Sequence, residues 1–134
     1  MDIVLHTIYK GAVKHVVALA IDGKSAARDY LQETEKTKPK EFTKLSVRIQ
    51  SVADTYQFRN SEIFRSEGNG IYAFKTSGGL RLYAFNDENQ LLVACFGADK
   101  AKKKQQQKDC QQARKWMDRY LEYKGSGANI EIRS

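Results

Sequence analysis

The sequence predicts an α+β fold in which a small antiparallel β-sheet carries two N-terminal helices on one face, a C-terminal helix, and an extra N-terminal strand. Residues 71–85 contain two short aromatic and branched runs around the turn Ser77-Gly78-Gly79, and a third apolar run follows at 91–96, as in an antiparallel meander. Residues 39–54 repeat apolar side chains at spacings of three and four, as in an amphipathic helix. A basic stretch at 100–104 follows the third run directly.

Length and composition indicate one domain, assigned to residues 1–124, followed by a short tail at 125–134. The chain has 134 residues, of which 41% are hydrophobic, and this is enough for a core without disulfides or metal ions. Its two cysteines, Cys95 and Cys110, lack metal-binding or redox spacing. The sequence shows no signal peptide and no apolar run of about 18 residues. It therefore predicts a cytoplasmic protein with no membrane contact, no cofactor and no metal.

The positive charge is concentrated in one part of the chain. The formal net charge is +7, and residues 96–124 carry nine Lys or Arg against four Asp or Glu, whereas residues 1–95 carry thirteen against eleven. A localised cationic patch favours a polyanionic partner, because neutralised phosphates release their counterions. The alternative is a solvated helix face that only keeps the protein soluble.

The N-terminal segment predicts a β-hairpin followed by two helices. Apolar residues alternate over residues 3–9, and residues 13–21 form a more buried run. Ser25 is placed to cap a short helix. Pro39 is tolerated in the first turn of a helix, so a second helix is expected from Pro39 to Asp54. Both helices are expected on the same face of the sheet.

Residues 56–70 have no clean periodicity and end in a turn-rich segment, so they are interpreted as a connector. Arg59 and Arg65 lie in it, where each either reaches an anionic ligand or stays solvated. His6 and His15 lie in the N-terminal strands. Packing or edge roles fit these histidines better than ligand or base roles, because no carboxylates are spaced to complete a metal site.

The central hairpin makes a geometric prediction. A three-residue loop at Ser77-Gly78-Gly79, with glycine in the left-handed conformation, places Lys75 directly opposite Arg81. Alternation then puts Lys75, Arg81 and Tyr83 on the face that points away from the N-terminal helices. Two opposed cations repel by roughly 0.2–1 kcal/mol, so the pairing makes sense if an anion binds between them. A loop of two or four residues would separate them. The core face is assigned to Tyr72, Phe74, Leu80, Leu82 and Ala84.

Residues 91–96 are apolar on both faces, as in a central strand. The basic run that follows opens a C-terminal helix, and this basic start has no apolar stripe, so it is free to meet a phosphate. Residues 129–132 form either an edge strand or a disordered end. From Cys110 onward an apolar stripe is expected to dock the helix on the sheet: Cys110, Ala113, Trp116, Met117, Tyr120 and Leu121.

An ordered set of short motifs carries a family resemblance over residues 16–123. The set is Ile71-Tyr72-Ala73-Phe74-Lys75, the Ser-Gly-Gly turn, Leu80-Arg81-Leu82-Tyr83, an apolar strand ending in Phe96-Gly97, a lysine run, and a helix with Gln112-Ala113-Arg114. In this order the chain resembles the phage-derived, HigB-type branch of the RelE superfamily of toxins. The resemblance implies a small antiparallel sheet flanked by helices and a ribosome-dependent mRNA endonuclease of a type II toxin–antitoxin system. It also implies a cognate antitoxin, often a helix-turn-helix protein.

The resemblance assigns the catalytic positions to Lys75 and Arg81. Two features depart from the family pattern: Lys104-Gln105-Gln106 stands where the family has threonine and proline, and no C-terminal histidine or tyrosine aligns with a family acid or base. The positions assigned to RNA binding, from the resemblance and from the charge pattern, are Arg65, Tyr83, Lys100, Lys102, Lys103 and Lys104.

The implied chemistry needs no metal. The ribose 2′-OH attacks the adjacent phosphate, and this requires a base for the hydroxyl, cations for the developing charge and an acid for the 5′ oxygen. Arg81 suits the second role, because guanidinium binds phosphate oxygens bidentately and keeps its proton. Lys75 is a base if neighbouring cations depress its pKa, and otherwise a second phosphate clamp. Tyr83 either stacks on an RNA base or packs in the core.

Two other readings stay open at this level. The chain is alternatively a non-catalytic module of the same fold that binds RNA or a protein partner through residues 100–108. In the other alternative, the chain is an interaction domain whose basic face only keeps it soluble.

Overall fold

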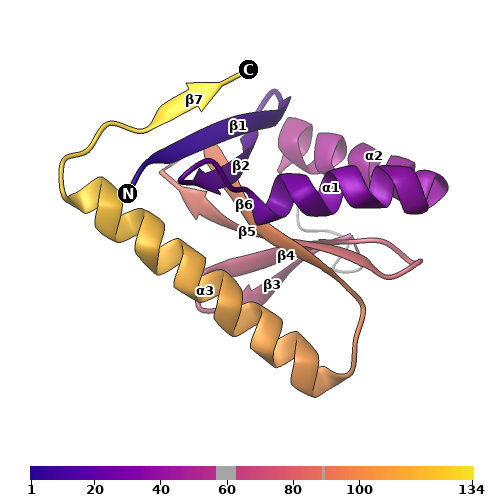
Figure 1. The fold of residues 1–134 in the computed structure, drawn as a ribbon. Helices are drawn as coiled ribbons and strands as arrows, with labels where there is room; N and C mark the ends of the chain where they lie inside the picture. Colours follow the sequence, from indigo (N-terminus) through magenta and orange to yellow (C-terminus); the bar gives the residue numbers. More distant parts are fainter. Residues whose placement is uncertain (57–62, 89) are drawn as a thin grey trace.

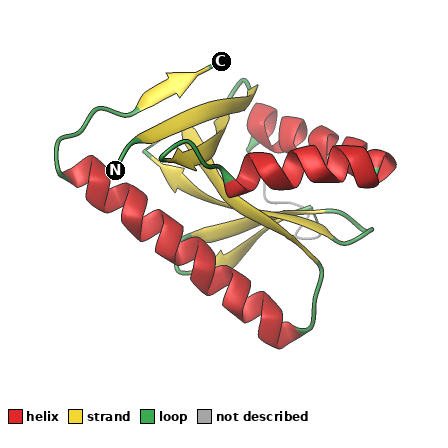
Figure 2. Ribbon diagram, viewed as in Figure 1, coloured by secondary structure: helices red, strands yellow, loops and turns green. Residues whose placement is uncertain are grey.

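The computed structural model describes residues 1–56, 63–88 and 90–134. In chain order its elements are β1 (Ile3–Lys10), β2 (His15–Ile21), α1 (Ala26–Thr37), α2 (Pro39–Thr55), β3 (Phe64–Gly68), β4 (Ile71–Lys75), β5 (Leu80–Asp87), β6 (Leu91–Asp99), α3 (Lys103–Gly125) and β7 (Glu131–Arg133). Within the described ranges, three helices pack on one seven-stranded sheet of order β3-β4-β5-β6-β2-β1-β7 (Figures 1 and 2). The predicted α+β class is confirmed.

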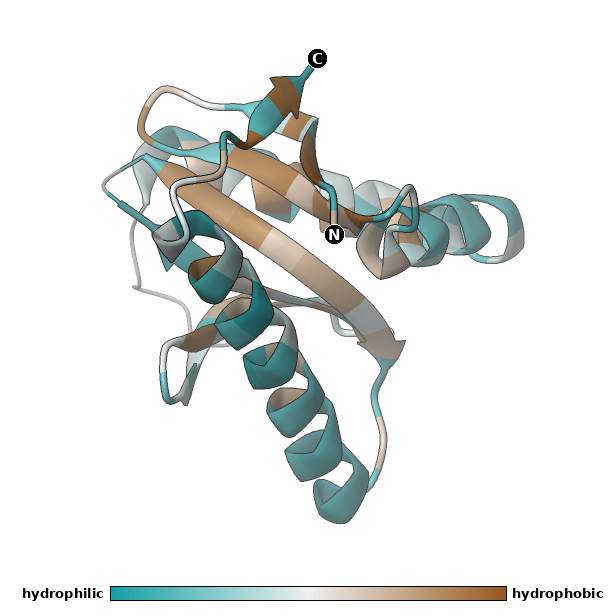
Figure 3. Ribbon diagram, turned by 60° about the vertical axis from the view of Figure 1, so that its left-hand side comes forward, coloured by the Kyte–Doolittle hydropathy of each residue, from teal (hydrophilic) through white to brown (hydrophobic). Residues whose placement is uncertain are grey.

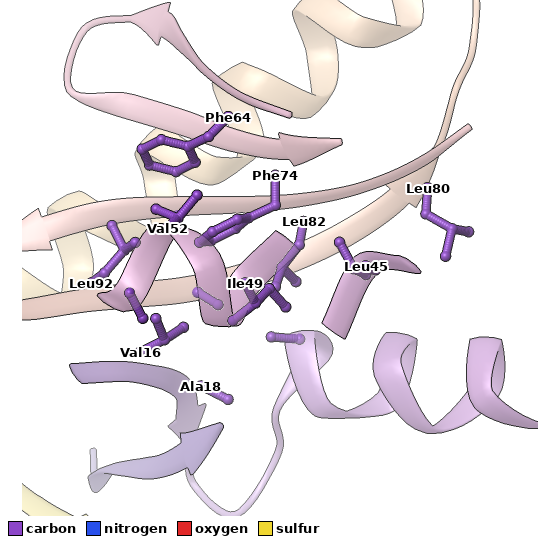
Figure 4. Close-up of a cluster of buried hydrophobic side chains, with 14 residues drawn as sticks. Val16, Ala18, Leu45, Ile49, Val52, Phe64, Phe74, Leu80, Leu82 and Leu92 are labelled. Atoms are coloured by element: carbon purple, nitrogen blue, oxygen red, sulfur yellow. The ribbon is translucent and has the colours of Figure 1, made fainter. Parts of the chain in front are cut away.

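Helices cover both faces of the sheet, and each face has its own core. α1 and α2 lie on one face and α3 lies on the other (Figure 1). On the first face, Leu45 and Ile49 of α2 pack with Phe74 of β4 (Figure 4). On the second, Tyr120 of α3 packs on Phe85 of β5, with ring centroids 5.4 Å apart. Each fully buried large apolar side chain stabilises the fold by about 1.5–3 kcal/mol, so the two cores stabilise the packing of helices on both faces of the sheet.

The two N-terminal helices begin and end where local chemistry dictates. The Ser25 hydroxyl accepts a hydrogen bond from the Arg28 N–H at 3.2 Å and caps α1. Pro39 occupies the first turn of α2, where its missing N–H has no consequence. Tyr56 ends α2 in the left-handed conformation, with φ of 45°, and its N–H bonds the carbonyl of Val52. Both predicted helices are therefore confirmed.

The N-terminal hairpin is confirmed, but the sheet is mixed and not wholly antiparallel. β1 and β2 pair antiparallel from Ile3 with Ile21 to Lys10 with His15. β2 then pairs parallel to β6, His15 lying opposite Leu91. Parallel neighbours need a long crossover, and the segment between β2 and β6 contains two helices and a three-stranded meander. Local sequence patterns carry no information on such a distant pairing.

The central hairpin has the predicted register. The Thr76 N–H bonds the Leu80 carbonyl at 3.0 Å, and Gly79 takes the left-handed conformation with φ of 96°. Lys75 therefore lies directly opposite Arg81, and the core-face assignment is also confirmed.

A strand was missed in the segment interpreted as a connector. β3 pairs antiparallel with β4, and its buried Phe64 stacks on Tyr72 with ring centroids 5.3 Å apart. Only the first residue of β3 is a large apolar one, so the strand carries no period-two signal. Arg59 lies outside the described residues.

α3 docks through a narrower stripe than predicted. Ala113 and Tyr120 are buried, whereas Leu121 is 45% exposed because it lies on the outer side of the helix. Figure 3 shows α3 as hydrophilic over most of its length. After the helix, β7 pairs parallel with β1, Val4 lying opposite Glu131, so the tail forms the edge strand that was one of its two predicted states. Of the helices described, none combines the length and apolarity needed to cross a bilayer.

The contact between α1 and β6 allows a test of packing. Gly97 of β6 lies flat against the Tyr30 ring, and a methyl group at position 97 would overlap the ring atoms. We expect Gly97→Ala to lower the free energy of unfolding by about 1–3 kcal/mol, measured by urea denaturation. Gly125→Ala is the control, because its added methyl meets no atom within 4 Å and alanine favours the end of α3. Equal stability of the two variants would contradict this account of the contact.

Candidate anion-binding site

A pocket of about 360 Å³ opens at the end of the β4–β5 hairpin. The β4–β5 turn and the β6–α3 connection meet at this end of the sheet, where the Lys100 N–H bonds the Gly79 carbonyl at 2.6 Å (Figure 1). The pocket is lined by Arg48, Ile63, Lys75, Thr76, Ser77, Gly79, Arg81 and Lys100. Half of these residues are cations and none is a carboxylate, so the positive potential of the pocket favours an anion.

The four cations come from four different elements or connections. Lys75 ends β4 and Arg81 lies opposite it on β5. Lys100 follows β6 and is tied to the β4–β5 turn through its backbone. Arg48 projects from α2 and donates from Nη1 to the Lys75 carbonyl at 2.8 Å. The pocket therefore depends on tertiary structure and is absent from any single element.

Arg81 is the most informative of the four. It is only 7% exposed, yet it forms no ion pair with any carboxylate of the described residues. Taking an unpaired cation out of water costs several kcal/mol, and natural proteins almost always compensate buried charges. An anion in the pocket would supply that compensation. Arg81 therefore points to a ligand more strongly than an exposed arginine would.

Lys75 is held in an environment that disfavours its charge. Partial burial lowers its pKa first, and the positive charges of Arg81, Arg65 and Lys100 lower it further, while Glu67 opposes them. The condition stated for Lys75 to act as a base, a pKa lowered by neighbouring cations, is therefore met in direction, with burial as the larger cause. A lysine of this kind acts as a proton acceptor more readily than an exposed one.

A carboxylate from α2 fixes the turn that borders the pocket. The Gly78 N–H donates to Glu41 Oε1 at 2.6 Å. A hydrogen bond from Thr76 is the largest cause of the lowered pKa of Glu41, with the Gly78 N–H and Lys44 adding to it against the effect of burial. Glu41 braces the turn from outside and does not line the pocket.

Tyr83 packs and is not placed to stack on a base. It is fully buried, and its ring stacks on Phe96 with centroids 5.1 Å apart. Burial raises the pKa of Tyr83 to about 12, although Arg81 beside it acts in the opposite direction. Its hydroxyl has no hydrogen-bond partner among the residues described. The RNA-stacking role assigned to Tyr83 is therefore corrected to a packing role.

The other residues assigned to RNA binding divide into two groups. Lys100 lines the pocket, as predicted. Arg65 lies exposed on β3, outside the lining, and acts on the site only through its effect on Lys75. The remaining three are exposed at the start of α3 and do not line the pocket: Lys102, Lys103 and Lys104.

Arg48 is the pocket cation that sequence reasoning missed. It lies three residues after Leu45 and four before Val52, both buried members of the α2 stripe. A cation within an apolar stripe is a detectable signal, because such a side chain must find a polar partner at the edge of the core.

The histidines play no part in this site. His15 lines a different pocket of about 460 Å³ with Asp87, Glu88, Gln90, Leu91 and Ile132, and its Nε2 lies 2.8 Å from the Thr7 hydroxyl. In the described part of the chain, no group of three or more His, Cys, Asp or Glu side chains is placed to hold a metal ion.

Comparison of the chain with protein-family models, with curated proteins and with solved structures finds no match. The functional argument therefore rests on the geometry of the pocket and on the sequence motifs.

The electrostatic coupling in the pocket is directly measurable. We expect Arg81→Met to raise the pKa of Lys75, observed by NMR titration of its side-chain Cε, because a repelling cation is removed. Arg28→Met, on α1 outside the pocket, is the control and should leave that pKa unchanged. Because the folded chain releases the Lys75 proton at lower pH than the unfolded chain does, this group adds stability as pH rises between the two pKa values. A Lys75 pKa that is the same with and without Arg81 would contradict the coupling.

Proposed function

We propose that this protein is an endoribonuclease of the mRNA interferase type, the toxin of a type II toxin–antitoxin pair, and that it cleaves mRNA without a metal ion. The observation that carries the proposal is that Arg81 is buried in a pocket lined by three further cations and pairs with no carboxylate of the described residues. An RNA phosphate is an anion that fits such a pocket and its chemistry. The RelE-like order of motifs around Lys75 and Arg81 supports the same function.

Each of the four pocket cations has a role in this proposal. Arg81 and Arg48 bind the oxygens of the scissile phosphate and stabilise the charge that develops there. Lys75 accepts the proton of the attacking 2′-OH, for which its lowered pKa suits it, while the bond from phosphorus to the 5′ oxygen breaks and solvent water protonates that oxygen. Otherwise Lys75 acts as a second phosphate clamp. Lys100 holds the flanking backbone together with Lys102, Lys103 and Lys104 at the start of α3.

The partners follow from the same proposal. The substrate is mRNA, bound on the ribosome, and a cognate antitoxin neutralises the protein by covering the cationic pocket. A helix-turn-helix antitoxin with an acidic segment would satisfy Arg81 in place of the phosphate.

The central test is substitution of Arg81. We expect Arg81→Ala to reduce mRNA cleavage on translating ribosomes by about 10²–10³-fold and to relieve growth inhibition, because one preorganised cation is lost from the transition state. New mRNA 5′ ends, mapped before and after induction, measure the effect. Arg28→Ala is the matched control, since it removes an arginine from α1. Full toxicity of a well-expressed, folded Arg81→Ala protein would contradict the assignment of the site.

The pH dependence separates the two roles of Lys75. If neutral Lys75 is the base, cleavage rises with pH and levels off at its pKa, which lies below the ordinary lysine value. Lys75→Arg keeps the positive charge, but its guanidinium cannot give up a proton and so cannot act as a base. We therefore expect this variant to lose the rise of cleavage with pH and about 10²–10⁴-fold in cleavage rate. Cleavage in the presence of Arg81→Ala protein gives the background to subtract. A parallel pH profile for wild type and Lys75→Arg would leave Lys75 as a phosphate clamp.

One observation favours a second candidate function. The described pocket lining contains no histidine or carboxylate to protonate the 5′ leaving oxygen. A non-catalytic module that binds RNA through the same cations needs no such group. Purified protein that binds RNA with a steep salt dependence, yet produces no new mRNA ends on translating ribosomes, would establish this alternative.

A further inference from the structure

A cationic stripe starts at Lys104 and continues along the outer side of α3. Lys104, Lys108, Lys115 and Arg119 are all exposed. Their separations of four, seven and four residues bring them within an arc of about 60° on a helix of 3.6 residues per turn. At about 1.5 Å per residue the stripe spans roughly 22 Å.

The charges on this stripe are not neutralised by the protein. No cation between Lys100 and Arg119 takes part in a salt bridge with a described residue. Arg119 contacts the Trp116 ring, with its guanidinium carbon 5.4 Å from the ring centroid, and Met1, and neither contact removes its charge. Like charges four residues apart destabilise a helix by a few tenths of a kcal/mol, so the stripe weakens α3 in the absence of a partner.

Few acidic residues lie near the stripe. Asp109 is buried, faces the sheet side and accepts a hydrogen bond from Gln105 at 3.0 Å. Asp118 lies on a neighbouring flank, and Glu122 marks the C-terminal end of the stripe. Between Lys104 and Arg119 the arc of the stripe therefore presents only positive charge, and it is bordered by Gln111, Gln112 and Asp118.

The stripe continues from the pocket. Lys100 lines the pocket and α3 begins at Lys103, so the two Cα atoms are at most about 11 Å apart. A phosphate held in the pocket would therefore sit close to the start of a row of cations. The stripe contains no large apolar side chain, whereas protein interfaces usually have an apolar core.

We infer that the stripe on α3 binds the sugar-phosphate backbone of a single RNA strand whose phosphate occupies the pocket. The inference rests on the proposed function for the identity of the pocket ligand. The strand is unpaired, because in-line attack by a 2′-OH requires a backbone that is free to rotate at that phosphate. The stripe matches about six nucleotides at the backbone spacing of a stacked strand.

The test compares two triple variants with equal loss of charge. The stripe variant is Lys108→Gln, Lys115→Gln and Arg119→Gln, in which glutamine preserves helix propensity. The control variant is Lys10→Gln, Lys24→Gln and Lys36→Gln, at exposed positions outside α3. The probe is a 2′-O-methyl oligouridylate of about 10 nucleotides, which cannot be cut, titrated at several salt concentrations. Circular dichroism confirms that both variants fold.

We expect the stripe variant to reduce the slope of log binding constant against log salt by about 2, because three contacts to a single strand are lost. The control variant should change it much less. A 2′-O-methyl dinucleotide that fills only the pocket should bind the stripe variant and the wild type equally, whereas Arg81→Ala should weaken binding of both probes. Equal slopes for the two triple variants would overturn the inference.

Two further arms separate this inference from the proposed function. A slope change on a blunt RNA duplex larger than on the single strand would overturn the single-strand assignment. If the stripe variant shows the reduced salt slope on the long probe but the wild-type protein cuts no mRNA, RNA binding by the stripe is supported and the nuclease proposal is refuted. Normal cleavage with no slope change would support the nuclease and refute the stripe.

Discussion

The register of the β4–β5 hairpin is the constraint on which the site depends. It holds Lys75 opposite Arg81, although their charges repel, because the ladder hydrogen bonds of the two strands leave no other pairing. Neighbouring elements reinforce the arrangement. The Tyr30 hydroxyl accepts a long hydrogen bond of 3.4 Å from the Arg81 N–H and donates to Asp99 at 2.9 Å. The energy that opposes the pairing is thus offset by packing and hydrogen bonds outside the pocket.

The two ends of the sheet differ in how their charges are paired. At the pocket end the four cations that line the pocket pair with no described carboxylate, whereas at the other end Asp87 is buried and bonded to the Tyr120 hydroxyl and to Lys124. Glu88 extends this acidic cluster and pairs with Lys124 at 2.7 Å. The network fixes the C-terminal part of α3 and so sets the direction of the whole helix. A charge distribution of this kind orients an approaching polyanion toward the pocket.

Local patterns in the sequence were sufficient for much of the fold and for part of the site. The hairpin register followed from a three-residue loop with glycine at its end, and the pairing of Lys75 with Arg81 followed from that register alone. Each of these inferences uses interactions between residues close in sequence, where spacing determines geometry.

The remainder depended on contacts between distant segments. The parallel pairing of β2 with β6 has no local signature, and β3 has a single buried apolar residue. Arg48 reaches the pocket only because α2 packs across the sheet, and Tyr83 is buried because α3 covers the opposite face. The start of α3 points away from the pocket, so its lysines lie outside the pocket lining: Lys102, Lys103 and Lys104. In each case the deciding interaction is tertiary.

The central position of β6 determines when the pocket can form during folding. β6 pairs with both β5 and β2. The pairing with β2 places Leu91 opposite His15, which lies far away in the sequence. Non-local pairings of this kind form slowly, because the loop entropy is lost before the contacts are gained. Arg48, Lys75 and Arg81 are synthesised well before Lys100, yet the pocket closes only after β6 has docked. A nascent chain therefore carries the cations without the site that they build.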